Sequence, residues 1–259
     1  MMNEAAIRPH VERIMKKAGD IILSYRFKPL ERVEKKNAGF VTIADTAAET
    51  YLMEELSKLE PGIGFFAEEN GHTTSKNDYC WVIDPLDGTT NFAYGLPHFC
   101  VSVALTNKDR PVLGCVYQPL LNEFFYAATG KGAYLNNSPI KVSGTQTIKD
   151  SFLLFCIPYG KNEGAQQLFE KVLMLSQKSY SMRLLGAAAL DQCYVASGRL
   201  DGMFFEQLSW WDIAAGSLII EEAGGVVSDY NGSPVSPHFN SFIAANPRIH
   251  EELVKIFSF

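Results

Sequence analysis

The stretch WVIDPLDGTTNF, residues 81–92, combines a strand pattern with two closely spaced acids. Its apolar start predicts a buried strand that ends at Asp84, and a second acid, Asp87, follows three residues later. Proline stiffens the turn between the two acids and Gly88 permits unusual backbone angles, so we expect the two carboxylates to converge. Converging acids repel each other unless a cation lies between them. The stretch therefore predicts a cation site at the mouth of a strand.

Other acids in the sequence also follow apolar runs. Taken singly, each has an ordinary explanation as a helix cap, a turn residue or a solvated loop acid. Together they form a set of hard oxygen donors without paired His or Cys ligands, which favours Mg²⁺, with Mn²⁺ as a substitute, over zinc. These acids are Asp45 after FVTIA, Glu68 and Glu69 after IGFFA, and Asp212 after LSWW.

The Gly-Thr-Thr sequence after Asp87 suits an anion. If a helix begins at Thr89, its first backbone N–H groups and its positive dipole end face the cation site and can hold a phosphate. Metal ions beside a phosphate are the layout of metal-assisted phosphoryl hydrolysis, in which one ion prepares the attacking water and another stabilises the leaving oxygen.

Composition limits the other functions. The chain has 259 residues, 47% of them hydrophobic, and a net charge of -6, which is typical of a soluble globular protein and unfavourable for direct nucleic-acid binding. Its five cysteines are scattered without C-x-x-C spacing, which favours a reducing compartment. The N-terminus lacks the apolar core of a signal peptide, and no apolar run approaches the roughly 18 residues of a membrane span. We therefore expect a cytoplasmic protein without a membrane partner.

The order of patterns predicts an α+β or layered α/β fold. Apolar spacing predicts a helix over residues 7–25, and Thr46 with Glu49 forms a candidate capping box for a helix over residues 46–59. Short β-rich runs over residues 64–135 predict a mostly antiparallel sheet. From residue 151 onward, strands alternate with helices, and neither a dinucleotide-binding nor a P-loop motif is present. The expected segments of this second half are strands at 151–156, 202–208 and 241–245 and helices at 166–178, 187–197, 213–223 and from Pro247.

The sequence resembles the inositol monophosphatases of the lithium-sensitive phosphatase superfamily. The resemblance rests on WVIDPLDGTTNF, AEEN at 67–70 and WWDIAAG at 210–216, and it extends to EEAGGVVSD at 221–229. It implies an α-β-α-β-α sandwich of the inositol monophosphatase and fructose-1,6-bisphosphatase type, and commonly a homodimer. One such domain would cover residues 1–259, with an N-terminal half at 1–145 and a C-terminal half at 146–259.

The resemblance also implies the role of each site residue. Glu68 corresponds to a metal-bridging acid that also takes part in catalysis, and Asp84, Asp87 and Asp212 correspond to metal-binding aspartates. Asp87 and Asp212 would also lie against the substrate. Leu86 would offer its backbone carbonyl to a metal.

Catalytic and phosphate-binding roles follow in the same way. Thr89 matches a threonine that positions the nucleophilic water, and Asp45 matches the acid that pairs with this threonine. The backbone N–H groups of Gly88 and Thr89 would hold phosphate oxygens. Gly186 and Ala188, in LLGAAALDQC, match positions beside the inositol ring.

Two departures from the family pattern concern the substrate. Animal members carry an acid seven residues before the last aspartate, where it contacts substrate hydroxyls. This sequence has Phe205 there, and Glu206, one residue later, is the candidate substrate contact in its place. The segment LLFCIPYGKNEG, residues 153–164, differs as well. We expect hydrolysis of myo-inositol monophosphate, and a broader sugar phosphatase that includes fructose 1,6-bisphosphate is the alternative. Thr90, where relatives acting on adenosine bisphosphate usually carry lysine, favours inositol phosphates.

The remaining alternatives concern a binding role and the aromatic residues. Some bacterial relatives also act as partners of the transcription machinery, although the sequence has no basic tail that would indicate this. We expect His98 to be a packing or interface residue rather than a base. Trp81, Trp210 and Trp211 are expected to cover the site and the core rather than to bind ligand.

Overall fold

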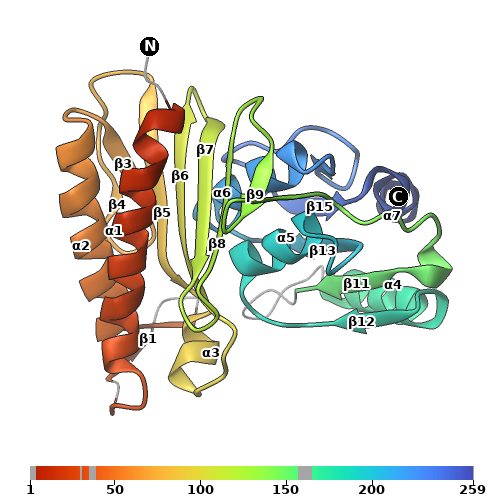
Figure 1. Ribbon diagram of the computed structural model, residues 1–259. Helices are drawn as coiled ribbons and strands as arrows, with labels where there is room; N and C mark the ends of the chain where they lie inside the picture. Colours follow the sequence, from red (N-terminus) through yellow and green to blue (C-terminus); the bar gives the residue numbers. More distant parts are fainter. Residues whose placement is uncertain (1–3, 30, 35–38, 157–164, 259) are drawn as a thin grey trace.

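The computed structural model describes residues 4–29, 31–34, 39–156 and 165–258. Helices and sheets alternate across the molecule in five layers, from α1 and α2 at one side to α4 and α7 at the other (Figure 1). This arrangement confirms the predicted α-β-α-β-α sandwich.

The first sheet has eight strands in the order β10-β9-β8-β7-β6-β5-β3-β4. Only β3 and β5 run parallel, and every other neighbouring pair is antiparallel, as the alternating β-rich runs predicted. The bounds are β3 (Gly64–Ala67), β4 (Gly71–His72), β5 (Tyr79–Asp87), β6 (Cys100–Asn107), β7 (Arg110–Gln118), β8 (Glu123–Ala128), β9 (Ala133–Leu135) and β10 (Ser138–Ile140).

Two helices, α1 (Glu4–Tyr25) and α2 (Ile43–Leu59), cover the outer face of this sheet. The predicted start of the second helix is wrong. The capping box consists of Thr42 and Asp45, one turn before the expected pair of Thr46 and Glu49. Thr42 has extended backbone and exchanges hydrogen bonds with Asp45, so the helix begins at Ile43.

The second sheet has five strands in the order β12-β11-β13-β15-β14. The sheet is mixed, because β11 runs parallel to both β12 and β13, whereas β15 is antiparallel to β13 and β14. Its strands correspond to the predicted strands and to two short additions, β12 and β14. The bounds are β11 (Phe152–Phe155), β12 (Ser181–Arg183), β13 (Gly202–Glu206), β14 (Val226–Ser228) and β15 (Ser241–Ala245).

Two pairs of helices enclose the second sheet. The helices α5 (Ala188–Ala196) and α6 (Trp210–Glu222) lie between the two sheets, and their apolar residues join a core with both of them. The helices α4 (Ala165–Lys178) and α7 (Pro247–Phe257) cover the opposite face. The short helix α3 (Thr89–Ala93) begins at Thr89, the start that the sequence suggested. The sequence patterns did not show β4, β10 and three further short elements: β1 (Arg32–Glu34), β2 (Phe40–Thr42) and the 3-10 turn η1 (Ile148–Asp150).

A glycine sets the distance between α6 and the first sheet. Gly114, on β7, packs against the helix backbone so closely that a Cβ there would lie 2.5 Å from the carbonyl oxygen of Ala215. Any larger residue at this position would push the helix away, because backbone atoms cannot yield as a flexible side chain can. Since Ala215 lies one turn into α6, Gly114 also fixes where that helix begins relative to the sheet.

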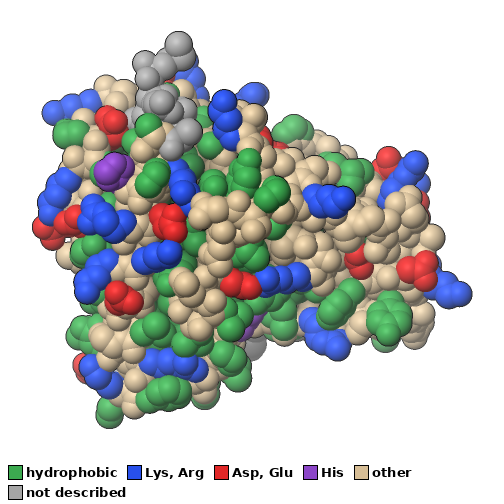
Figure 2. Space-filling view, in the orientation of Figure 1, with side chains coloured by type: hydrophobic (Ala, Val, Ile, Leu, Met, Phe, Trp, Pro, Cys, Tyr) green, Lys and Arg blue, Asp and Glu red, His purple; other side chains and the backbone are tan. Residues whose placement is uncertain are grey.

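The face shown in Figure 2 carries Lys and Arg side chains interspersed with Asp and Glu. Within the described residues, no helix is both long enough and apolar enough to cross a membrane.

Candidate active site

A bulge in β5 brings the two acids of the opening stretch together. The strand does not stop at Asp84, as the sequence suggested, but continues to Asp87. Asp84 pairs with Ser102 of β6 and Asp87 pairs with Cys100, so β5 has one extra residue in this interval. Side chains three residues apart on a regular strand point to opposite faces. The extra residue reverses this alternation, and both carboxylates therefore face the same cavity.

Parallel pairing places Glu68 next to Asp84. Ala67 at the end of β3 is the partner of Ile83 in β5, and the Glu68 N–H donates to the Ile83 carbonyl at 3.2 Å. The next residue on each strand is an acid, so two neighbouring strands deliver their carboxylates at the same edge of the sheet.

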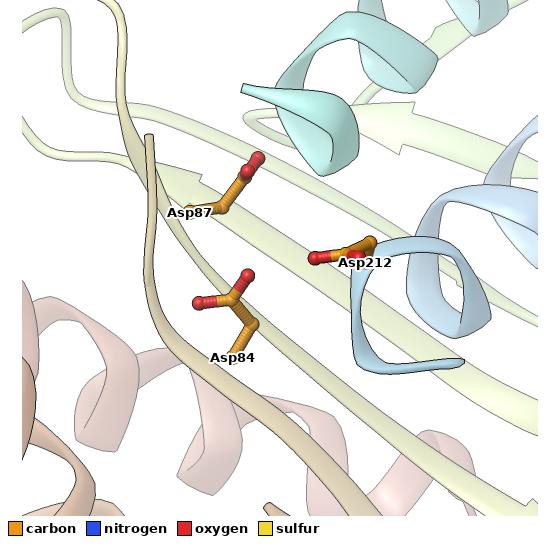
Figure 3. Close-up of side chains that lie close together, drawn as sticks. All are labelled: Asp84, Asp87 and Asp212. Carbon is orange, nitrogen blue, oxygen red and sulfur yellow. The ribbon is translucent and has the colours of Figure 1, made fainter. Parts of the chain in front are cut away.

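The third carboxylate comes from the other half of the chain. Asp212 lies in the first turn of α6, where its Oδ2 accepts a hydrogen bond from the Ser209 N–H at 2.7 Å. Asp84, Asp87 and Asp212 each present one carboxylate oxygen within 4.8 Å of the others. In Figure 3 the carboxylates of Asp84 and Asp212 face the space between β5 and α6, and the Asp87 carboxylate beside them is directed toward the start of α5. Asp212 is therefore a helix-capping residue and a member of the acidic cluster at once.

The electrostatics of this cluster fit a cation. Burial raises the pKa of Asp84 well above its usual value, and the charges of Glu68, Asp87 and Asp212 raise it further. The pKa of Asp87 rises to about 6, because the group is buried and lies near Asp191. A positive charge among buried carboxylates at this spacing would stabilise their charged forms. The donors are all oxygens, which is the set that Mg²⁺ and Mn²⁺ prefer.

No sequence pattern indicated how the Asp87 carboxylate is held. Its carboxylate accepts hydrogen bonds from three consecutive backbone N–H groups at the start of α5: Ala188 at 2.9 Å, Ala189 at 2.8 Å and Leu190 at 3.3 Å. The contacting residues lie about a hundred positions away along the chain, so no local pattern could reveal them. These bonds orient Asp87 and connect the two halves at the site.

Thr89 and Asp45 lie beside the acidic cluster. Thr89 is the first residue of α3, as predicted, and its Oγ1 lies 2.9 Å from Asp45 Oδ1 and 3.0 Å from the Leu86 carbonyl. The other oxygen of Asp45 accepts from the N–H and the hydroxyl of Thr42, at 2.9 Å and 2.6 Å. Burial raises the pKa of Asp45, and these hydrogen bonds oppose the rise. The geometry lets Thr89 donate its proton to Asp45 and keep its lone pairs for a water molecule.

Gly88 connects β5 to α3 at a position that no other residue fits. Its φ is +87°, and a Cβ there would lie 2.9 Å from the His98 carbonyl oxygen and 3.1 Å from Ala187 Cβ. We expect Gly88→Ala to displace Asp87 and Thr89 together and to lower the free energy of unfolding by at least about 1 kcal/mol, the usual cost of a left-handed non-glycine residue. A urea titration measures this loss, and unchanged stability would contradict the assignment.

The cavity around these residues has a volume of about 370 Å³. It contains most of the residues predicted from the sequence and several that were not predicted. Glu68, Asp84, Leu86, Asp87, Gly88, Thr89, Gly186, Ala188 and Asp212 line it as expected. Asp45 reaches it through Thr89. The additional residues are Gly39, Phe40, Thr90, Cys156, Leu184, Gln207, Leu208, Ser209 and Trp211.

Glu206 is the one predicted substrate residue that the structure does not bring to the cavity wall. Lys171 of α4 is its charged neighbour, and burial raises the pKa of Glu206. The adjacent Phe204 belongs to the core beneath α4 and α7, whereas Phe205 faces α5 and α6. Alternation along β13 therefore directs Glu206 to the outer layer. Gln207 and Leu208 take its place in the cavity wall.

The structure also shows the surroundings of the aromatic residues. Trp81 and Trp210 are buried in the core, and Trp211 lines the cavity. His98 Nε2 lies 2.7 Å from Asp191 Oδ1 and packs edge-on against Tyr194. Both contacts are with α5, which agrees with a packing role. In the divergent segment 153–164, residues 157–164 lie outside the described residues.

Fold and site together place a cluster of carboxylates that could hold a metal ion beside a cavity, an arrangement that is typical of metal-dependent hydrolases. The model of the inositol monophosphatase family matches residues 4–259. The chain therefore belongs to the inositol monophosphatase family, which confirms the resemblance seen in the sequence.

Individual relatives agree with this membership. The chain is 41% identical over 238 residues to an inositol-1-monophosphatase of Synechocystis, covering 91% of this chain and 83% of the relative. It is 40% identical over 245 residues to the Nus factor SuhB of Pasteurella multocida, covering 93% and 92%. The crystal structure of the extragenic suppressor protein suhB from Bartonella henselae superposes with a TM-score of 0.93 at 33% identity, covering 97% of this chain and 98% of that chain.

Proposed function

We propose that this protein hydrolyses inositol monophosphate to inositol and phosphate with Mg²⁺ as its cofactor. The observation that carries the proposal is the convergence of Asp84, Asp87 and Asp212 within 4.8 Å of one another, beside the hydrogen-bonded pair of Thr89 and Asp45. The family is one of phosphatases that are generally metal-dependent, and a relative of 41% identity is named an inositol-1-monophosphatase.

The roles of the protein groups follow from their positions. A divalent ion at the cluster supplies neutralisation of the carboxylates and activation of water at neutral pH. Asp84, Asp87, Asp212 and Glu68 would hold it, together with the Leu86 carbonyl. Thr89 accepts a hydrogen bond from the attacking water; as this water loses its proton to Thr89 Oγ1, Thr89 gives its own hydroxyl proton to Asp45. The water oxygen bonds to phosphorus and the bond from phosphorus to the inositol oxygen breaks. The leaving oxygen takes up a proton from solvent water, so that inositol leaves as the alcohol.

Phosphate release tests the proposal. We expect the purified protein to release phosphate from inositol 1-phosphate when Mg²⁺ is present, to lose this activity with EDTA and to be inhibited by lithium. Activity that is unaffected by EDTA would contradict the metal assignment. If no inositol phosphate is hydrolysed, the substrate class is wrong.

A panel of sugar phosphates, including fructose 1,6-bisphosphate, distinguishes the broader alternative. Gln207 and Leu208 in the cavity wall, in place of an acid, are the feature that favours this alternative. Similar kcat/KM values across the panel would support it, whereas a preference of tenfold or more for inositol 1-phosphate, about 1.4 kcal/mol, would support the narrower function.

The similarity to Nus factors raises a second role, as a partner of the transcription machinery. A pull-down from cell extract with the inactive Asp84→Asn variant tests it, and recovery of RNA polymerase subunits is the supporting result. A homodimer and a cytoplasmic location remain predictions. Sedimentation analysis and cell fractionation, respectively, test them.

A further inference from the structure

The helix α2 presents two buried carboxylates one turn apart. Asp45, at its start, faces Thr89 as described above. Glu49 lies four residues later and is completely inaccessible to solvent. Residues four apart on a helix share one face, so both carboxylates point toward the sheet and the site. Burying a carboxylate is costly unless several donors bind it, and Glu49 therefore needs an explanation.

Among the residues that the structure describes, the donors that bind Glu49 come from the two residues that follow Glu68. Glu49 Oε2 accepts a hydrogen bond from the Glu69 N–H at 3.0 Å. Glu49 Oε1 accepts from the Asn70 N–H and from Asn70 Nδ2, both at 2.7 Å. Hydrogen bonds to a charged acceptor are about twice as strong as neutral ones. Glu49 therefore fastens the turn between β3 and β4 to α2.

The conformation of this turn determines where the Glu68 side chain points. On one side, the Glu68 N–H is bound to Ile83 of β5, and on the other, the next two residues are bound to Glu49. The Glu68 backbone is thus fixed at both ends, with its side chain next to Asp84. Without Glu49, two backbone N–H groups of the turn would lose their acceptor, and the strand end would hold Glu68 on one side only.

We propose that Glu49 is a positioning residue that orients Glu68 for metal binding. The inference rests on the proposed metal site. A group that supports a metal ligand typically changes metal affinity by 10–100-fold when it is removed. Glu49 thus complements Asp45, and one helix supports both the water-positioning threonine and the acid at the end of β3.

The variant Glu49→Gln tests this with little change of shape. One acceptor oxygen becomes an NH₂ donor, which faces the turn's own donors and cannot replace the lost bond. Glu54→Gln is the matched control, because Glu54 lies on the same helix but is exposed and paired with Lys58. The probe is Mn²⁺ alone, titrated by calorimetry without substrate.

We expect Glu49→Gln to weaken Mn²⁺ binding about tenfold or more, while Glu54→Gln retains the wild-type affinity. Amide hydrogen exchange at residues 69 and 70 should become faster only in Glu49→Gln. A purely structural role would lower the melting temperature and leave the Mn²⁺ affinity of the folded protein unchanged, which would overturn the proposal.

A second variant keeps the test decisive if Glu49→Gln does not fold. Asn70→Asp changes an exposed residue and places a carboxylate where Nδ2 now donates to Glu49 at 2.7 Å, so it should also weaken Mn²⁺ binding. Wild-type affinity in this variant overturns the inference, as does a wild-type protein that binds no Mn²⁺. If the wild type binds Mn²⁺ but hydrolyses no phosphate ester, the proposed function fails and the positioning role stands.

Discussion

Replacing Asp84 by Asn is expected to lower the rate of phosphate release on the order of a thousandfold. A catalytic metal stabilises the transition state by several kcal/mol, and each ~1.4 kcal/mol changes the rate by a factor of ten. Burial raises the pKa of Asp84 well above its usual value, and the three neighbouring carboxylates raise it further. The amide keeps an oxygen for the Leu86 N–H, which donates to Asp84 Oδ1 at 3.0 Å, so the fold of the bulge should persist.

The same substitution should affect stability in the opposite direction. Without metal, the amide removes a repelling charge from the cluster, and the melting temperature of Asp84→Asn should exceed that of the metal-free wild type. Mg²⁺ should raise the wild-type melting temperature through ligand linkage and raise that of the variant less. Asp78→Asn, at a surface ion pair with Lys108, is the control for both measurements. Full activity in Asp84→Asn would refute the metal assignment.

The second large effect is expected at Thr89. Thr89→Ala removes the hydroxyl that lies 2.9 Å from Asp45, and with it the acceptor for the attacking water. A positioned proton acceptor typically raises the reaction rate 10²–10⁴-fold, so we expect kcat of Thr89→Ala to fall at least about a hundredfold. KM should change little, since phosphate binding by backbone N–H groups does not need the side chain.

Thr89→Ser is the matched control for this prediction. It retains the hydroxyl and loses only a methyl group, so kcat should remain within about tenfold of wild type, with the smaller loss due to a less restricted χ1 angle. Equal losses of kcat in Thr89→Ala and Thr89→Ser would show that the threonine is needed for packing rather than for proton transfer.

Much of the fold was predictable because its elements are strongly patterned. The apolar spacing of α1 buries one face of the helix on the first sheet, and the β-rich runs of β6, β7 and β8 form strands that are buried on both faces of this sheet. The start of α2 was predicted wrongly because two Thr-x-x-acid patterns lie four residues apart and both look like capping boxes. Only the tertiary contacts of Glu49 show that it is committed to another segment.

The candidate site was predictable in composition more than in geometry. The acids at strand ends and at the start of α6 could be recognised, but their convergence depends on a bulge in β5, on parallel pairing of β3 with β5 and on the close approach of α6 to Gly114. The three N–H groups that hold Asp87 come from a distant segment and leave no local signal. Gln207 was not predicted because an uncharged amide carries no metal or phosphate signal in the sequence, whereas the neighbouring Glu206 does.

A crystal soaked in Mn²⁺ provides the most direct test that a divalent ion neutralises these carboxylates. The account predicts an anomalous peak between Asp84, Asp87 and Asp212, with carboxylate oxygens about 2.0–2.4 Å from the ion. A map without a peak at this centre, or with the carboxylates turned away from one another, would contradict it.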